Sequence, residues 1–161
     1  MTGRTDGHVR SGEFTATEQA ASLQRVLVNL VALRLQGKQA QWTTVASGGG
    51  ALGGHLDELV DDLGKSGDRV AERIRELGAV PDGRAPTVVA GAGLDPFPLG
   101  EHTGPVAARL VADRLRTVAG VVRAARDDVD ADDPATADLL RQIVESIDRH
   151  ASLVGAEAEQ V

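Results

Sequence analysis

Apolar residues return every three or four positions in four separate segments of this 161-residue chain. That spacing places them along one side of an α-helix, because the side chains of a strand alternate at every second residue. Aromatic residues make up only 2% of the chain, so the core must be built from Leu, Val, Ile and Ala. The pattern predicts an all-α fold with four long helices packed as a bundle.

Capping signals set the expected limits of the first two helices. Thr15-Ala-Thr-Glu18 fits a capping box, which predicts a first helix over residues 15–42. A glycine-dense stretch at residues 47–54 separates it from the second helix. That helix is expected to end at about Leu77, because Gly78 occupies a favoured position for a helix C-cap.

Residues 80–104 form a long connector that contains four prolines. A connection of this length usually crosses a bundle from end to end, so the second and third helices need not be antiparallel neighbours. The third helix is expected from about Pro105, and Asp133-Pro134 marks the start of the fourth. The predicted domain organisation is a flexible tail at 1–14, a bundle at 15–156 and a short acidic tail at 157–161.

Composition and charge exclude several classes of function. The chain has no cysteine, which excludes disulfides, thiolate metal sites and cysteine nucleophiles. Its formal net charge of −7 is unlike that of a general nucleic-acid-binding surface, which needs clustered cations. Residues 1–14 contain no apolar signal segment, and no stretch is apolar enough to span a membrane. We therefore expect a cytoplasmic protein that does not associate with membranes.

Three carboxylates fall on one side of the second predicted helix. At about 100° per residue, Asp57 and Asp68 lie within roughly 20° of each other, and Glu72 lies about 40° further round. Asp61 and Glu76 widen this stripe, while the apolar residues of the segment lie on the far side. An acidic stripe is often only the solvated face of a helix, so the pattern alone leaves open whether it binds a cation.

The segments Leu30–Trp42, Leu56–Leu59 and Ala71–Pro81 resemble the Dps family of ferritin-like proteins, and Thr136–Leu140 resembles its fourth helix. Together the similarity covers about residues 20–155. It implies a four-helix bundle with a long crossover between helices two and three, assembling into a hollow dodecameric shell. It also implies iron uptake and storage inside that shell, and protection of DNA during starvation or oxidative stress.

The resemblance further implies an iron site shared across a two-fold interface. The positions of the family's ligands are, in this chain, Gln41, Gly53, Asp57, Asp68 and Glu72, where the family has His, His, Asp, Asp and Glu. The three carboxylates match and both histidines are replaced. Imidazole is a good ligand for Fe(II), whereas an amide binds weakly and glycine has no side chain. We therefore expect weak iron binding and slow or absent ferroxidase activity.

Other candidate residues follow from the same resemblance. His55 lies about 200° from Gly53 around a helix and should point away from the stripe, unless the segment is not helical. Asp113 is a candidate for the acidic lining of a three-fold pore. Arg4 and Arg10 are the candidates for DNA binding, which should be weak because Asp6 and Glu13 offset them.

The favoured interpretation is a Dps-like miniferritin subunit for iron storage and stress protection, with a weakened or absent ferroxidase centre. The alternative is a non-catalytic shell that coats nucleoid DNA or acts as a scaffold, and iron content after loading distinguishes the two. A small bundle that binds an organic ligand is a third possibility. Trp42 fits a core or an interface position better than a chemical role.

Overall fold

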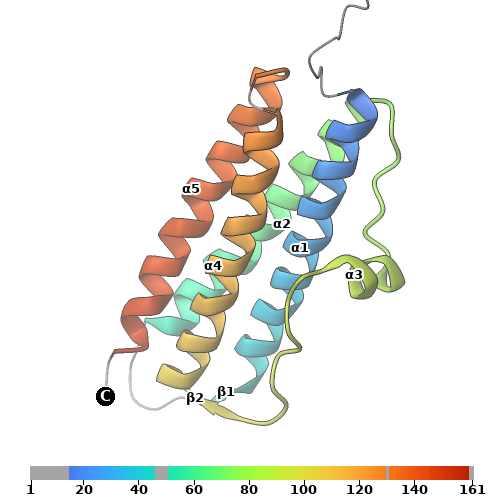
Figure 1. Cartoon of the computed structure of the whole chain (residues 1–161). Coiled ribbons are helices and arrows are strands. Elements are labelled where there is room, and N and C mark those ends of the chain that lie inside the picture. The colour runs from blue at the N-terminus through green and yellow to red at the C-terminus, as the bar shows by residue number, and fades with distance from the viewer. Residues whose placement is uncertain (1–14, 46–50, 130, 160–161) are drawn as a thin grey trace, which may run out of the picture.

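The computed structural model describes residues 15–45, 51–129 and 131–159. Within these ranges four long helices lie side by side: α1 (Ala16–Thr43), α2 (Leu52–Glu76), α4 (Gly104–Val129) and α5 (Pro134–Glu157) (Figure 1). The helix α1 packs against α2 and α4, and α5 packs against α4 and α2. The all-α bundle predicted from the apolar spacing is confirmed, and α2 and α4, which are the second and third long helices, occupy diagonal positions.

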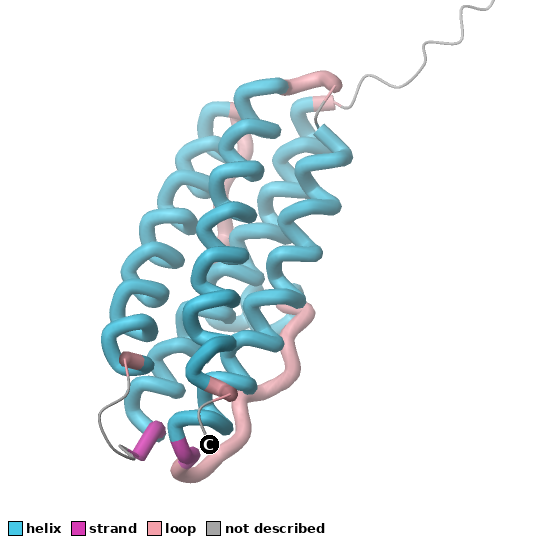
Figure 2. The backbone as a smooth tube through the Cα atoms, turned by 90° about the vertical axis from the view of Figure 1, so that its left-hand side faces the viewer, coloured by secondary structure: helices cyan, strands magenta, loops and turns pink. Residues whose placement is uncertain are grey.

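The crossover from α2 to α4 runs along the outside of the bundle and is partly structured (Figures 1 and 2). It contains the short helix α3 (Ala85–Gly91) and the two-residue strand β2 (His102–Thr103). The strand β2 pairs in parallel with β1 (Thr44–Val45), so that Thr44 lies opposite His102. The sequence indicated only a connector here, because elements of two to seven residues leave no periodic pattern.

Two polar side chains of α1 fasten the crossover to the bundle. The Gln24 amide donates to the Asp82 carbonyl at 2.7 Å and accepts from the Asp82 N–H at 3.0 Å. The buried Asn29 side chain accepts from the Gly93 N–H at 3.0 Å. These bonds satisfy backbone groups that a loop packed on a helix would otherwise leave without partners.

The helix ends follow the capping signals closely. The Thr15 hydroxyl accepts from the Glu18 N–H at 3.3 Å, and Glu18 accepts from the Thr15 N–H at 2.8 Å, which completes the capping box. Gly78 follows α2 with φ of +81°, and Asp133 caps α5. One boundary differs from expectation, because Glu157 belongs to α5 and is buried rather than part of an acidic tail.

A single large apolar cluster fills the centre of the bundle, to which α1, α2, α4 and α5 all contribute. Its largest fully buried side chains include Leu23, Leu30, Leu56, Leu59, Leu115, Leu140 and Ile143. The helix α1 passes close to α2 at Gly37, where an added Cβ would lie 3.0 Å from Val60 Cγ2. Among the described residues, no helix is long and apolar enough to cross a membrane.

Candidate functional site on the α1–α2 face

The three candidate carboxylates lie exposed on α2, on the side away from the core, as the stripe predicts. Asp68 and Glu72 are one turn apart, or about 6 Å along the helix. Asp57 is eleven residues before Asp68, which is about 16 Å along the axis. Within the described part of the chain, no group of three or more His, Cys, Asp or Glu side chains is close enough to hold a metal. Within one subunit, Asp57 is therefore separated along α2 from Asp68 and Glu72.

Gln41 and Asp57 are brought together at one end of the stripe. The Gln41 Nε2 group near the end of α1 donates to Asp57 Oδ1 at 2.7 Å. The Oε1 atom of Gln41 is buried and has no hydrogen-bond partner among the residues that the structure describes. An amide thus takes one oxygen of the carboxylate that would otherwise be free to bind a cation.

Gly53 lies one turn before Asp57, in the first turn of α2, with open space where a Cβ would project. His55 is also in this helix, and its Nδ1 atom faces the buried Glu157 of α5 at 3.9 Å. Since the glycine-rich start of α2 is helical, His55 points away from the carboxylate stripe. It does not take the place of a ligand at position 41 or 53.

The remaining predicted residues lie elsewhere. Asp113 is exposed on α4 and forms an ion pair with Arg116 at 2.9 Å. Arg4 and Arg10 lie outside the described residues. Trp42 is 73% exposed, with the Lys38 ammonium 5.6 Å from the ring centroid, so the core interpretation of Trp42 is wrong. Its place at an interface stays a prediction.

Arg34 is a site residue that the sequence did not indicate. Its guanidinium lies over Gly64, so that a Cβ added there would be only 3.2 Å from Arg34 Cζ, and its Nε donates to the Val60 carbonyl at 3.3 Å. Gly64 lies between Asp57 and Asp68 on the same side of α2. The spacing agrees with this contact once the contact between Gln41 and Asp57 is known, because Arg34 precedes Gln41 by two turns of α1 and Gly64 follows Asp57 by two turns of α2.

At the other end of α2, Arg73 joins the helix to the start of α5. Its Nη2 atom lies 2.7 Å from Asp133 Oδ2, and its Nε donates to Thr136 Oγ1 at 2.8 Å. Burial raises the pKa of Asp133, but hydrogen bonds from Thr136 and Arg73 outweigh it, so the net pKa lies below its ordinary value. The hydrogen bonds to Asp133 and Glu76 raise the pKa of Arg73. These contacts of Arg73 with Asp133 and Thr136 fix the orientation of the C-terminal half of α2, which carries Asp68 and Glu72.

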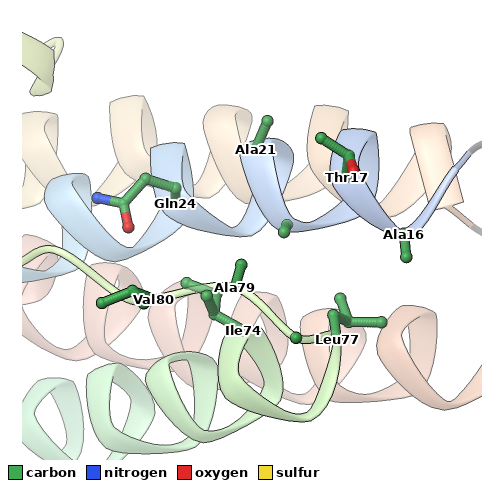
Figure 3. A pocket seen from close by; sticks show the side chains of 10 residues that line it. Ala16, Thr17, Ala21, Gln24, Ile74, Leu77, Ala79 and Val80 are labelled. Atoms are coloured by element: carbon green, nitrogen blue, oxygen red, sulfur yellow. The ribbon is translucent and has the colours of Figure 1, made fainter.

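A cavity of about 280 Å³ opens between the first turns of α1 and the segment that follows α2 (Figure 3). Ala16, Ala21, Ile74, Leu77 and Ala79 supply most of its apolar lining. Gln24 is the largest polar group there, and its amide is bonded to Asp82. Since the lining has no titratable side chain, the cavity adds no candidate chemistry.

Comparison with known proteins places the fold in a family. A family model described as a ferritin-like domain matches residues 20–161. The crystal structure of Dps92 from Deinococcus radiodurans superposes with a TM-score of 0.78 at 32% identity, covering 91% of this chain and 88% of that one. The chain belongs to the Dps family of ferritin-like proteins. The structure of DpsA14 from Streptomyces coelicolor also superposes on this Dps chain, with a TM-score of 0.85 at 28% identity, covering 91% and 87% of the two chains.

A curated relative agrees with this assignment. The DNA protection during starvation protein 2 of Deinococcus radiodurans is 35% identical over 144 residues. The match covers 87% of this Dps chain and 58% of the length of that relative. This chain therefore spans somewhat more than half of the length of that relative.

Proposed function

We propose that this Dps chain is a subunit of a closed dodecameric shell that takes up Fe(II) through Asp57, Asp68 and Glu72. Asp68 and Glu72 of one subunit and Asp57 of its neighbour form each site. The separation of about 16 Å along α2 supports this division, because no single cation can contact both ends of the stripe in one chain. The exposed carboxylates and the matching family positions are the observations that carry the proposal.

Exposed apolar side chains support assembly. Leu35 and Trp42 on α1 are 61% and 73% exposed, and Val89 on α3 is 82% exposed. Large apolar side chains exposed on a small domain favour contact with another subunit. A symmetric shell would cover them and would bring two carboxylate stripes together.

The donor set explains why oxidation should be slow. Carboxylate oxygens suit hard cations, and imidazole nitrogens, which bind Fe(II) better, are absent at positions 41 and 53. The Gln41 amide must also release Asp57 before that carboxylate can bind with both oxygens. Each peroxide takes one electron from each of two Fe(II) ions, together with two protons, and leaves as two water molecules. The ferric product would then collect inside the shell.

Finer assignments belong to the same proposal. Asp113 guides cations through a pore, although it must first release Arg116. DNA binding through Arg4 and Arg10 is weak and sensitive to salt, because few phosphates are neutralised by each chain. The shell acts in the cytoplasm, where contact with the nucleoid is transient.

Iron loading tests the proposal. The purified metal-free protein is titrated anaerobically with Fe(II), exposed to peroxide or oxygen, and passed through a gel-filtration column before its iron content is measured. We expect slow oxidation by the wild-type protein, and at least about tenfold faster oxidation by a variant with both Gln41→His and Gly53→His. Open space at Gly53 allows the imidazole. Asp68→Asn in that variant is the control and should abolish the gain.

Three outcomes would contradict this reasoning. A fast, saturable oxidation phase in the wild-type protein would show that the site needs no imidazole. An unchanged rate in the double variant would show that positions 41 and 53 do not face the carboxylates. A shell that retains no iron after loading would favour the second candidate, a non-catalytic shell or nucleoid scaffold, which the Gln41–Asp57 hydrogen bond also permits.

A further inference from the structure

Two histidine–carboxylate pairs join α2 to α5. His55 of α2 faces Glu157 of α5, and Asp62 of α2 faces His150 of α5. The two pairs are seven residues apart on each helix, which is about two turns. The second pair is closed, since His150 Nε2 lies 2.8 Å from Asp62 Oδ2 and Arg149 also contacts Asp62. The packing of α2 on α5 can therefore bring an imidazole and a carboxylate into direct contact.

The pair formed by His55 and Glu157 is open by comparison. The Nδ1 atom of His55 lies 3.9 Å from Glu157 Oε1, which is too far for a hydrogen bond. This Nδ1 atom is buried and has no hydrogen-bond partner among the residues that the structure describes. The Glu157 side chain is only 10% exposed, and no Lys or Arg in the described ranges pairs with it. Because buried polar groups normally have partners, two such groups that face each other are suited to hold a third.

The distance between the two atoms fits a shared cation better than a direct hydrogen bond. A Zn²⁺ ion lies about 2.1 Å from an imidazole nitrogen and from a carboxylate oxygen, so tetrahedral geometry places the two ligand atoms about 3.4 Å apart. Atoms that are 3.9 Å apart must approach by about 0.5 Å to reach this geometry, whereas a hydrogen bond requires about 1 Å. Both adjustments move α2 and α5 together, and the cation requires the smaller one.

We propose that His55 and Glu157 bind a divalent transition-metal ion of the Zn²⁺ type between the first turn of α2 and the last residue of α5. The site uses no carboxylate of the α2 stripe, because His55 points away from it. Imidazole nitrogen suits Zn²⁺ and Cu²⁺, whereas carboxylates alone suit harder cations. Water completes the coordination, since no cluster of three metal-binding side chains occurs within the described ranges. The bound ion would stabilise the folded chain by linking the two helices.

Binding of Zn²⁺ to the full chain, measured by isothermal titration calorimetry, tests the proposal. The parent protein carries Asp68→Asn and Glu72→Gln, which remove the stripe as a competing site. His55→Ala in this parent should abolish one binding site per chain. Glu157→Gln should weaken that site at least about tenfold, because even the loss of a group outside the ligand shell can cost a metal site that much. His102→Ala is the control and should change nothing, since this imidazole contacts the backbone of the crossover instead.

Cu²⁺ provides a second readout that does not depend on the heat of binding. Its electron paramagnetic resonance spectrum should show splitting by an imidazole nitrogen in the parent and in His102→Ala, and that splitting should disappear in His55→Ala. Glu157→Gln keeps the size of the side chain, so the variant should fold, and circular dichroism checks this.

The inference is overturned if His55→Ala or Glu157→Gln binds Zn²⁺ like the parent, or if His102→Ala weakens binding as much as His55→Ala does. It is also overturned if the parent binds no Zn²⁺, because the two side chains would then form only an ion pair. Failure of the proposed function is distinct, because iron loading through the stripe depends on Asp68 and requires neither His55 nor Glu157.

Discussion

Arg73 holds the ends of two helices together, and its replacement should be costly. The side chains of Arg73 and Asp133 are only 24% and 12% exposed, and they lie 2.7 Å apart. A hydrogen bond to a charged group contributes about 1.5–3 kcal/mol, whereas the bond from Arg73 to the exposed Glu76 should add little. Arg73→Gln should therefore lower the free energy of unfolding by about 2–3 kcal/mol at neutral pH.

The pH dependence makes this prediction specific. Because the pKa of Asp133 is lowered in the folded chain, its contribution is present above the unfolded value of about 3.9 and is lost as the pH falls through the folded value. The difference between wild type and Arg73→Gln should thus shrink progressively below about pH 4.

Urea unfolding at one protein concentration, followed by circular dichroism at several pH values, measures this difference. A fixed concentration is needed because assembly adds to the apparent stability. Arg75→Gln is the control, since Arg75 is exposed in the same last turn of α2, and it should change the stability by less than about 0.5 kcal/mol. If Arg73→Gln lowered the free energy of unfolding by the same amount at neutral and at acidic pH, the role assigned to Asp133 would be refuted.

Two further predictions concern helix packing and the crossover. Gly120→Ala should stabilise the chain by about 1 kcal/mol because the new Cβ meets open space, whereas Gly37→Ala should destabilise it because its Cβ would lie 3.0 Å from the buried Val60 side chain. The urea concentrations at the unfolding midpoints of the two variants measure this difference in stability. Equal shifts would show that α1 and α2 are not tightly packed at Gly37. Asn29→Ala should cost about 1–3 kcal/mol by leaving the Gly93 N–H without its partner. Limited proteolysis should then cut the crossover faster, and an unchanged cleavage rate would mean that Asn29 does not hold it.

Local signals were sufficient to predict the four long helices. The capping box at Thr15, the proline after Asp133 and the glycine after α2 act within one turn of the chain, so their effect can be read from neighbouring residues. The stripe on α2 was predictable for the same reason, because helical periodicity alone decides which residues share a face.

Contacts between distant residues were not predictable in this way. The pairing of Thr44 with His102 joins two short segments that lie 58 positions apart, and no local pattern marks either one. The position of Arg34 on Gly64 depends on where α1 crosses α2, which only the packed structure shows. The exposure of Trp42 likewise depends on where the other helices lie.

The replaced histidines and the position of Arg34 have a common physical consequence. In this Dps chain the Gln41 amide donates to Asp57, and the Arg34 guanidinium lies over Gly64 of the same helix and donates to the Val60 carbonyl. These donors are always present, whereas iron is not. A cation that approaches Asp57 must therefore first displace the hydrogen bond from Gln41, and the nearby positive charge of Arg34 opposes its binding as well.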